Sequence, residues 1–112
     1  MAILVQNTLP SLARTVTGSV DIGAVPAEFT EAAIYIDVTA VAGTAPTMTM
    51  TYQTSPDGVT FYDHTAGAQL MAAGRQVIRA ANTIGRFGRL SFVVGGTTPS
   101  FTFSATSEFK RP

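Results

Sequence analysis

The chain has 112 residues, of which 46% are hydrophobic and 12% are charged, with no cysteine and a formal net charge of zero. This length suits one domain with a core of its own. The lack of cysteine excludes a disulfide framework and a thiolate metal site, and a neutral chain lacks the excess of Lys and Arg on which nucleic-acid binding depends. The charged share is about half the usual one, which indicates that much of the surface is covered by something other than solvent.

The N-terminal residues lack the basic and apolar regions of a signal peptide, and no stretch reaches the ~20 apolar residues that span a bilayer. We therefore expect a soluble protein that is made in a cytoplasm and has no membrane partner.

The charges are distributed unevenly along the chain. Residues 1–63 contain six acidic residues and one basic residue, a net charge of −5, whereas residues 64–112 contain six basic residues and one acidic residue, a net charge of +5. Either strands from the two halves interleave and neutralise each other, as in many sandwiches, or the module docks its acidic side on the basic side of a copy or neighbour. Six of the seven cations are Arg, which interfaces favour over Lys.

Residues 1–12 are an apolar arm interrupted by Pro10, and residues 13–112 are the domain proper. The arm is either a first edge strand or a segment that lies on a partner. Alternation of apolar and polar side chains, which is typical of a strand with one buried face, predicts strands over 14–22, 32–41, 47–53, 59–62, 75–81, 87–94 and 100–107. Residues 64–74 are predicted to be a loop. The expected core residues include Ile34, Ile36, Val38, Met48, Met50, Tyr52, Leu90, Phe92, Phe101 and Phe103.

Two features predict the connections between strands. The sequence Ser55-Pro56-Asp57-Gly58 is typical of a tight turn, because Pro presets one backbone angle and Gly adopts the left-handed conformation that closes a bulged hairpin. Residues 41–51 also align without a gap on residues 94–104, with Gly, Thr and Pro in common. Each copy is expected to be a hairpin with a Gly-Thr-x-Pro loop, and the two hairpins to pack face to face.

The fold class that follows is all-β: a single antiparallel β-sandwich, immunoglobulin-like or jelly-roll, of about seven to eight strands. Two copies of the repeat are too few for a solenoid, which needs about three.

No group of residues predicts catalysis. His64 is the only histidine, and Asp63 beside it would point to the opposite face of an extended strand. We expect no enzyme activity, no cofactor and no metal site, since an active site needs several groups within mutual reach. Tyr35, Tyr52 and Tyr62 would form a sugar platform only if exposed, and Tyr52 lies on an apolar face.

Residues 38–63, followed by Arg-Phe-Gly-Arg-Leu at 86–90 and the second repeat at 94–103, resemble the small β-sandwich virion proteins of tailed bacteriophages. In that family a Gly-Thr-x-Pro segment precedes Ser-Pro-Asp-Gly and an aromatic residue, and a Gly-Gly-Thr-x-Pro-Ser segment follows later. The resemblance covers residues 36–106. Phe61 stands where the family usually has tryptophan.

The resemblance implies a structural protein of the phage virion, most directly a capsid decoration or cement protein that binds the outer surface of the head and stabilises it. A tail- or fibre-associated sandwich, or a carbohydrate-binding module that mediates host attachment, is the alternative. The partners would be the major capsid protein, copies of this chain, or both, with no nucleic acid. The residues predicted to contact a partner are Ile3, Leu4, Val5 and Leu9 for apolar burial, and Arg75, Arg79, Arg86, Arg89, Lys110 and Arg111 as cations.

Overall fold

The computed structural model describes residues 3–25, 29–80 and 84–110. These contain six strands and no helix: β1 (Ile3–Arg14), β2 (Gly18–Ala24), β3 (Glu31–Ser55), β4 (Tyr62–Ala66), β5 (Gly74–Ala80) and β6 (Phe87–Lys110). Every strand pairing is antiparallel, so the predicted all-β fold is confirmed. No helix long and apolar enough to cross a membrane occurs in the described residues.

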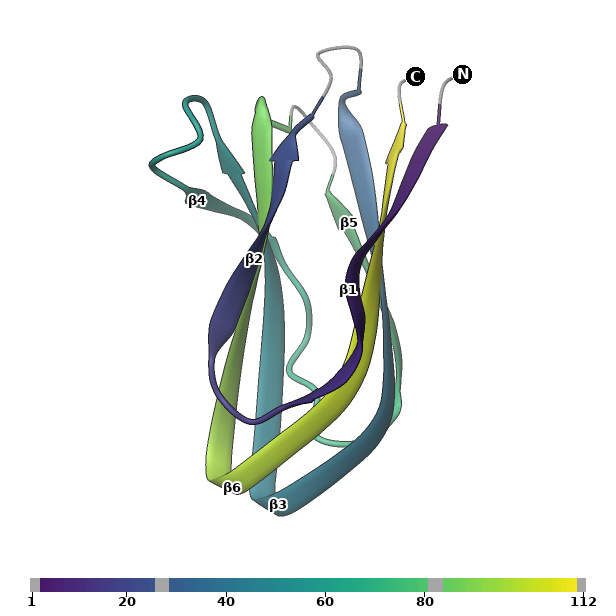
Figure 1. The fold of residues 1–112 in the computed structure, drawn as a ribbon, viewed down its shortest axis with the longest axis vertical. Helices are drawn as coiled ribbons and strands as arrows, with labels where there is room; N and C mark the ends of the chain where they lie inside the picture. The colour runs from purple at the N-terminus through teal and green to yellow at the C-terminus, as the bar shows by residue number, and fades with distance from the viewer. Residues whose placement is uncertain (1–2, 26–28, 81–83, 111–112) are drawn as a thin grey trace.

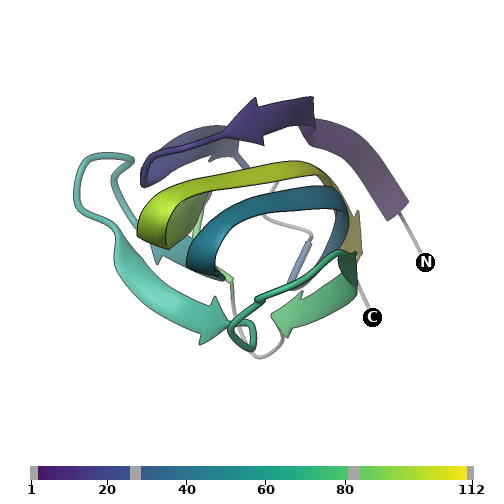
Figure 2. The same cartoon turned by 90° about the horizontal axis from the view of Figure 1, so that it is seen from below.

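Two very long strands organise the fold. β3 and β6 pair along nearly their whole length, from Glu31 with Lys110 to Ser55 with Phe87, and both bend over at mid-length (Figures 1 and 2). The bend turns one continuous sheet into two facing layers. The β1/β5 layer has the order β1, second half of β6, first half of β3, β5; the β2/β4 layer has the order β2, first half of β6, second half of β3, β4. The molecule is an antiparallel β-sandwich.

The two sequence repeats form this bend. They do not make two hairpins that face each other, as predicted, because residues 41–51 pair with residues 91–101: Val41 lies opposite Phe101, and Met48 opposite Val94. The backbone is the same in both copies, with positive φ at Gly43 (108°) and Ala45 (49°) and at their counterparts Gly96 (111°) and Thr98 (50°). The repeat therefore encodes two matching corners that lie side by side and turn the chain from one layer to the other.

The corners fit each other reciprocally. A Cβ atom on Gly43 would lie 2.6 Å from the carbonyl oxygen of Thr98, and one on Gly96 would lie 2.7 Å from that of Ala45. Both contacts are far shorter than van der Waals distances, so glycine is required at each position by space as well as by φ. Since β3 and β6 run on through the corners, each takes up two of the predicted strands, which is why six strands replace the predicted seven to eight.

The core lies between the two layers and is built as the alternation predicts. The ten core residues named from the sequence lie in one buried cluster: Ile34, Ile36, Val38, Met48, Met50, Tyr52, Leu90, Phe92, Phe101 and Phe103. Leu9, Ile78, Ala105 and Phe109 from β1, β5 and β6 also belong to it, together with Val25, Phe29, Ala32, Ala80 and Ile84.

Three local predictions were wrong. The strand expected over 14–22 is broken at residues 15–17, where Val16 is 71% exposed instead of buried. The strand that returns after the Asp-Gly turn begins at Tyr62, because Asp57 accepts hydrogen bonds from the backbone of Val59 and Thr60 and so extends the turn. Residues up to Ala66 of the predicted loop 64–74 belong to β4, and the loop starts after them.

Of the two alternatives for the uneven charge, the structure shows the first: strands from the two halves of the chain interleave. β3 from the acidic half pairs with β5 and β6 from the basic half. Asp37 and Arg75 form an ion pair, with 3.6 Å between Oδ1 and Nε, and Glu31 lies opposite Lys110. Strands of the acidic and basic halves therefore lie side by side in one sheet, and the imbalance along the sequence does not divide the molecule into an acidic and a basic half.

Candidate functional site

The residues predicted to contact a partner do not form one surface. The arm lies in the sheet as the start of β1, with Ile3, Leu4 and Val5 opposite Lys110, Phe109 and Glu108 of β6. Of the two alternatives for this segment, edge strand is therefore the conformation that it adopts. Arg111 lies outside the described residues.

Leu9 and Arg89 contribute to the molecule itself. Leu9 is only 6% exposed and belongs to the core cluster. Arg89 donates from Nε to Oε1 of Gln53 at 2.8 Å, and its guanidinium carbon lies 4.1 Å from the ring centroid of Phe61. Leu9 is therefore buried within the molecule and Arg89 has partners of its own, while their contact with another protein stays a prediction. Alternation alone does not distinguish a side chain held within the molecule from one that is exposed.

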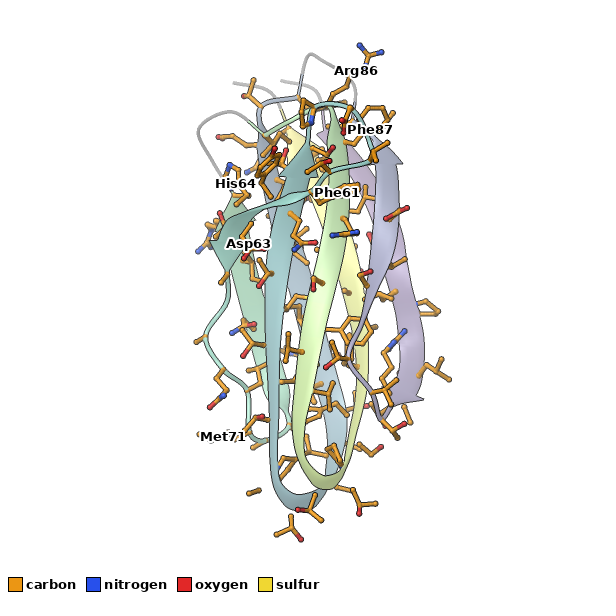
Figure 3. The ribbon with its side chains drawn as sticks, turned by 90° about the vertical axis from the view of Figure 1, so that its left-hand side faces the viewer. Phe61, Asp63, His64, Met71, Arg86 and Phe87 are labelled. Atoms are coloured by element: carbon orange, nitrogen blue, oxygen red, sulfur yellow. The ribbon has the colours of Figure 1, made fainter. Side chains whose placement is uncertain are left out.

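Arg86 and Lys110 lie at the open end of the sandwich, which we define as the end opposite the corners, where β1 begins and β6 ends (Figure 1; Arg86 is labelled in Figure 3). The loop of residues 56–61 is part of this end and exposes Val59, of which 81% is accessible. The open end thus carries charge and an exposed loop together.

The loop at the open end is fixed by side chain to backbone hydrogen bonds. Ser55 Oγ accepts from the backbone nitrogens of Asp57 and Gly58 and donates to Asp57 Oδ1. Asp57 Oδ1 accepts from Val59 and Thr60 at 2.9 and 3.0 Å. These backbone donors, Val59 first, lower the pKa of the Asp57 carboxyl. The predicted left-handed glycine is Gly58, with φ of 78°.

The corner end is the opposite end of the molecule, and it is formed by four segments that are far apart in sequence. These are the two corners (residues 42–46 and 95–99), the β1–β2 link (15–17) and the β4–β5 link (67–73). In the view along the long axis, the corners lie in the middle with one link on either side (Figure 2). Hydrogen bonds tie the links to the corner strands: Thr17 Oγ1 accepts from Val94 N at 3.0 Å, and Leu70 N donates to Met48 O at 2.7 Å.

None of the residues in these four segments is charged. The end also exposes large apolar side chains: Val16 in the first link, Met71 in the second at 64% (Figure 3), and Leu12 and Val93 on the strands beside them. Single exposed apolar side chains are common on proteins, but here they occur at an end whose four connecting segments carry no charge. Depletion of charge with Met and other apolar groups at the centre is characteristic of protein interfaces.

Arg14 is the cation nearest to the corner end, and it is folded against the protein. Its guanidinium donates to the carbonyl oxygens of Phe103 at 2.7 Å, Pro10 at 2.9 Å and Leu12 at 3.0 Å, and lies 4.4 Å from the ring centroid of Phe103. Burial lowers the pKa of Arg14, while its carbonyl partners accept from the charged form. Arg14 thereby fixes the end of β1 onto β6, with hydrogen bonds from both of its terminal nitrogens.

A second exposed surface is the outer face of the β1/β5 layer. Arg75, Val77 and Arg79 of β5 all project from it, as the alternation predicted. Tyr35 of β3 lies opposite Val77, and its hydroxyl donates to a carboxylate oxygen of Glu108 at 3.2 Å. The face has a shallow hollow of about 340 Å³, lined mainly by Tyr35, Asp37, Arg75, Val77, Ser104 and Thr106.

The tyrosines do not form one sugar platform. Tyr35 and Tyr62 are exposed on opposite layers, while Tyr52 is fully buried, as expected. Burial raises the pKa of Tyr52 to about 12. Its ring contacts that of His64 edge-on, with centroids 6.0 Å apart.

His64 and its acidic neighbour do not converge. The His64 Nδ1 atom is 2.7 Å from Thr65 Oγ1, whereas Asp63 accepts from Gln53 Nε2 at 2.8 Å. Within residues 3–25, 29–80 and 84–110, no group of three or more His, Cys, Asp or Glu side chains is placed to hold a metal ion.

No protein-family model and no curated protein sequence matches the chain. Solved structures do. The SPBc2 prophage-derived protein YomS superposes with a TM-score of 0.57 at 8% identity, over 97% of this chain and 95% of that one. A Bacillus endospore appendage, from a family of disulfide-linked pili, superposes with a TM-score of 0.55 at 14% identity, over 98% of this chain and 89% of that one.

The structure of the Gx strain of infectious bursal disease virus gives 0.55 at 10% identity, over 96% of this chain and 31% of that one. At such low identities these matches show that the sandwich fold is shared along almost the whole of this chain.

Proposed function

We propose that this protein is a structural component of a phage virion: a decoration protein that binds the outer surface of the head through its corner end. The observation that carries the proposal is the uncharged corner end, with Val16 and Met71 exposed from its two links. A prophage protein, a virus and a pilus provide structures that share the fold, and this supports a structural role. The resemblance of residues 36–106 to the sandwich proteins of tailed phages supports a place on the phage head.

The corner end is suited to binding because it is uncharged and is built on paired strands. Its centre is formed by paired strands that run through the corners without a break, so little conformational entropy is lost on binding. Burying a side chain the size of Val or Met contributes roughly 1.5–3 kcal/mol, and no charge in the four segments has to be desolvated. With extents of 43 × 27 × 20 Å, a molecule held by this end would project from the shell.

Binding of this kind would stabilise the head by mass action. If the assembled shell offers the site and free capsid subunits do not, each bound copy adds its binding free energy to the stability of the shell. The open end, with Arg86 and Lys110, would then face solvent or other copies.

The test uses expanded shells of the major capsid protein encoded nearest to this chain's gene. Wild-type protein should co-sediment with the shells and raise their melting temperature. Val16→Asp and Met71→Asp should each weaken binding at least tenfold, because a charge would be buried without a partner. Val59→Asp, an equally exposed change at the open end, is the matched control and should bind as wild type does. Absence of shell binding by wild type, or a loss confined to Val59→Asp, would refute the proposal.

A further inference from the structure

We propose that the outer face of the β1/β5 layer binds a second copy of this chain, related to the first by a two-fold axis that runs parallel to β3. The pairing involves a different surface from the corner end and does not depend on the proposed function.

Three adjacent strands supply this face, in rows fixed by their register. β5 and β6 flank the first half of β3, so each outward residue of β3 has one neighbour on either side. The rows, written from β5 to β6, are Arg75–Asp37–Ser104, Val77–Tyr35–Thr106 and Arg79–Ala33–Glu108. The β5 column is thus basic at both ends, and the carboxylates lie on β3 and β6.

This pattern is self-complementary under one particular rotation. A two-fold axis parallel to the strands and above β3 exchanges the β5 column with the β6 column and keeps every row in place. Arg79 of each copy then lies over Glu108 of the other, since both flank Ala33. An axis across the strands would instead place Arg79 over Arg75, and two like charges repel each other. The first arrangement also brings the two Asp37 carboxylates together on the axis, but each is paired with Arg75 of its own copy, and the Arg79–Glu108 contact forms twice. The balance of charge therefore favours the first arrangement.

The groups that would pair between copies can be reached from outside. Glu108 is half-buried, and its Oε1 atom accepts from Tyr35 of its own copy, so its Oε2 atom is the acceptor offered to Arg79 of the second copy. Arg79 is exposed, and within the described residues it takes part in no ion pair. Arg75 is paired with Asp37, but the two side chains are 86% and 46% exposed, and a surface pair of this kind contributes little and can exchange partners. Asp37 lies on the axis, so Arg75 of one copy can then pair with Asp37 of the other.

The centre of the face is apolar and hollow. Tyr35 and Val77 expose 43% and 40% of their surface, and the hollow of about 340 Å³ lies beside them. Tyr35 lies next to the proposed axis, so the ring from the second copy would cover this hollow. An aromatic residue at the centre with charged groups around it is the usual arrangement of an interface.

The contact is expected to be modest in size. A seven-residue β5 is about 24 Å long and three strands are about 14 Å wide, an area below the standard of about 800 Å² per partner. The dimer should therefore form reversibly and dissociate on dilution.

Charge reversal tests the pairing. In sedimentation equilibrium, the full wild-type chain should show concentration-dependent dimers. Arg79→Glu and Glu108→Arg should each weaken association at least tenfold, and an equimolar mixture of the two variants should recover much of the loss by forming heterodimers. Arg86→Glu, at the open end, should associate as wild type does. A monomer at every concentration, or a mixture no stronger than either variant alone, would overturn the proposal.

The position of the axis can be tested separately, because the chain has no cysteine. Tyr35→Cys places one thiol beside the axis, and a short bismaleimide should join two copies in high yield. Val93→Cys places an exposed thiol on the other layer and should give few cross-linked dimers. Equal yields from both variants, or a higher yield from Val93→Cys, would contradict the proposed face.

Discussion

The two ends of this sandwich achieve their shape in different ways. At the corner end, two strands cross from layer to layer without a break, and paired glycines let their backbones approach to distances at which any Cβ atom would clash. At the open end, the loop of residues 56–61 joins β3 to β4 within one layer, and polar side chains such as Ser55 and Asp57 hold its backbone. The difference shows how a chain can keep one end free of charge: where backbone geometry fixes the corners, no charged side chain is needed to hold them.

The largest expected effect on stability comes from filling the space at a corner. Gly43→Ala should destabilise the fold by at least about 3 kcal/mol, because the strain at positive φ adds to a clash with the Thr98 carbonyl. Gly58→Ala at the open end should cost about 1–2 kcal/mol, since its Cβ would be 3.3 Å from the ring of Phe87, which can shift. Chemical denaturation measures both. Equal losses would mean that the corner is not the more constrained end.

A smaller effect is expected from the cation that fixes β1. Arg14→Ala should lower the free energy of unfolding by about 1–2 kcal/mol, since it removes the hydrogen bond to Phe103 O and the contact with the Phe103 ring. Arg86→Ala, at the exposed position of the open end, should change it by less than about 0.5 kcal/mol. Urea denaturation of the pair tests this difference, and a larger effect at Arg86 would contradict it.

The smallest effect is a pH dependence at the open end. Hydrogen bonds from Val59, then Thr60, lower the pKa of Asp57 in the folded state, so its carboxylate stabilises the fold above pH about 4, the usual unfolded value. This contribution is lost as the pH falls through the lower folded-state pKa. The difference in unfolding free energy between wild type and Asp57→Asn should therefore shrink as the pH falls below 4. A difference that is constant from neutral to acidic pH would rule out this role.

The sequence predicts which residues face the core, because the two-residue alternation that identifies a strand also identifies its buried side. It does not predict which strands pair over long distances. The Gly-Thr-x-Pro repeats were correctly recognised as equivalent, but each was expected to close a hairpin on itself. In the structure they pair with each other, since the contact that requires glycine comes from the other copy, about fifty residues away.

The candidate surfaces were predicted only in part. Arg75 and Arg79 share an exposed face, as the alternation indicates, whereas Leu9 and Arg89 are engaged within the molecule. The corner end was missed because its four segments are separate in the sequence. A signal was present: residues 42–46, 67–73 and 95–99 all lack charge, but only the fold shows that they lie at one end.

The most direct test of the central claim, that the corner end is the surface that meets the shell, is hydrogen–deuterium exchange of free and shell-bound protein. The links at residues 15–17 and 67–73 lie outside the named strands, so many of their amides should exchange readily in the free protein. We predict that shell binding slows exchange in both links and leaves residues 56–61 at the open end unchanged. Slower exchange at residues 56–61, with both links unaffected, would contradict the account.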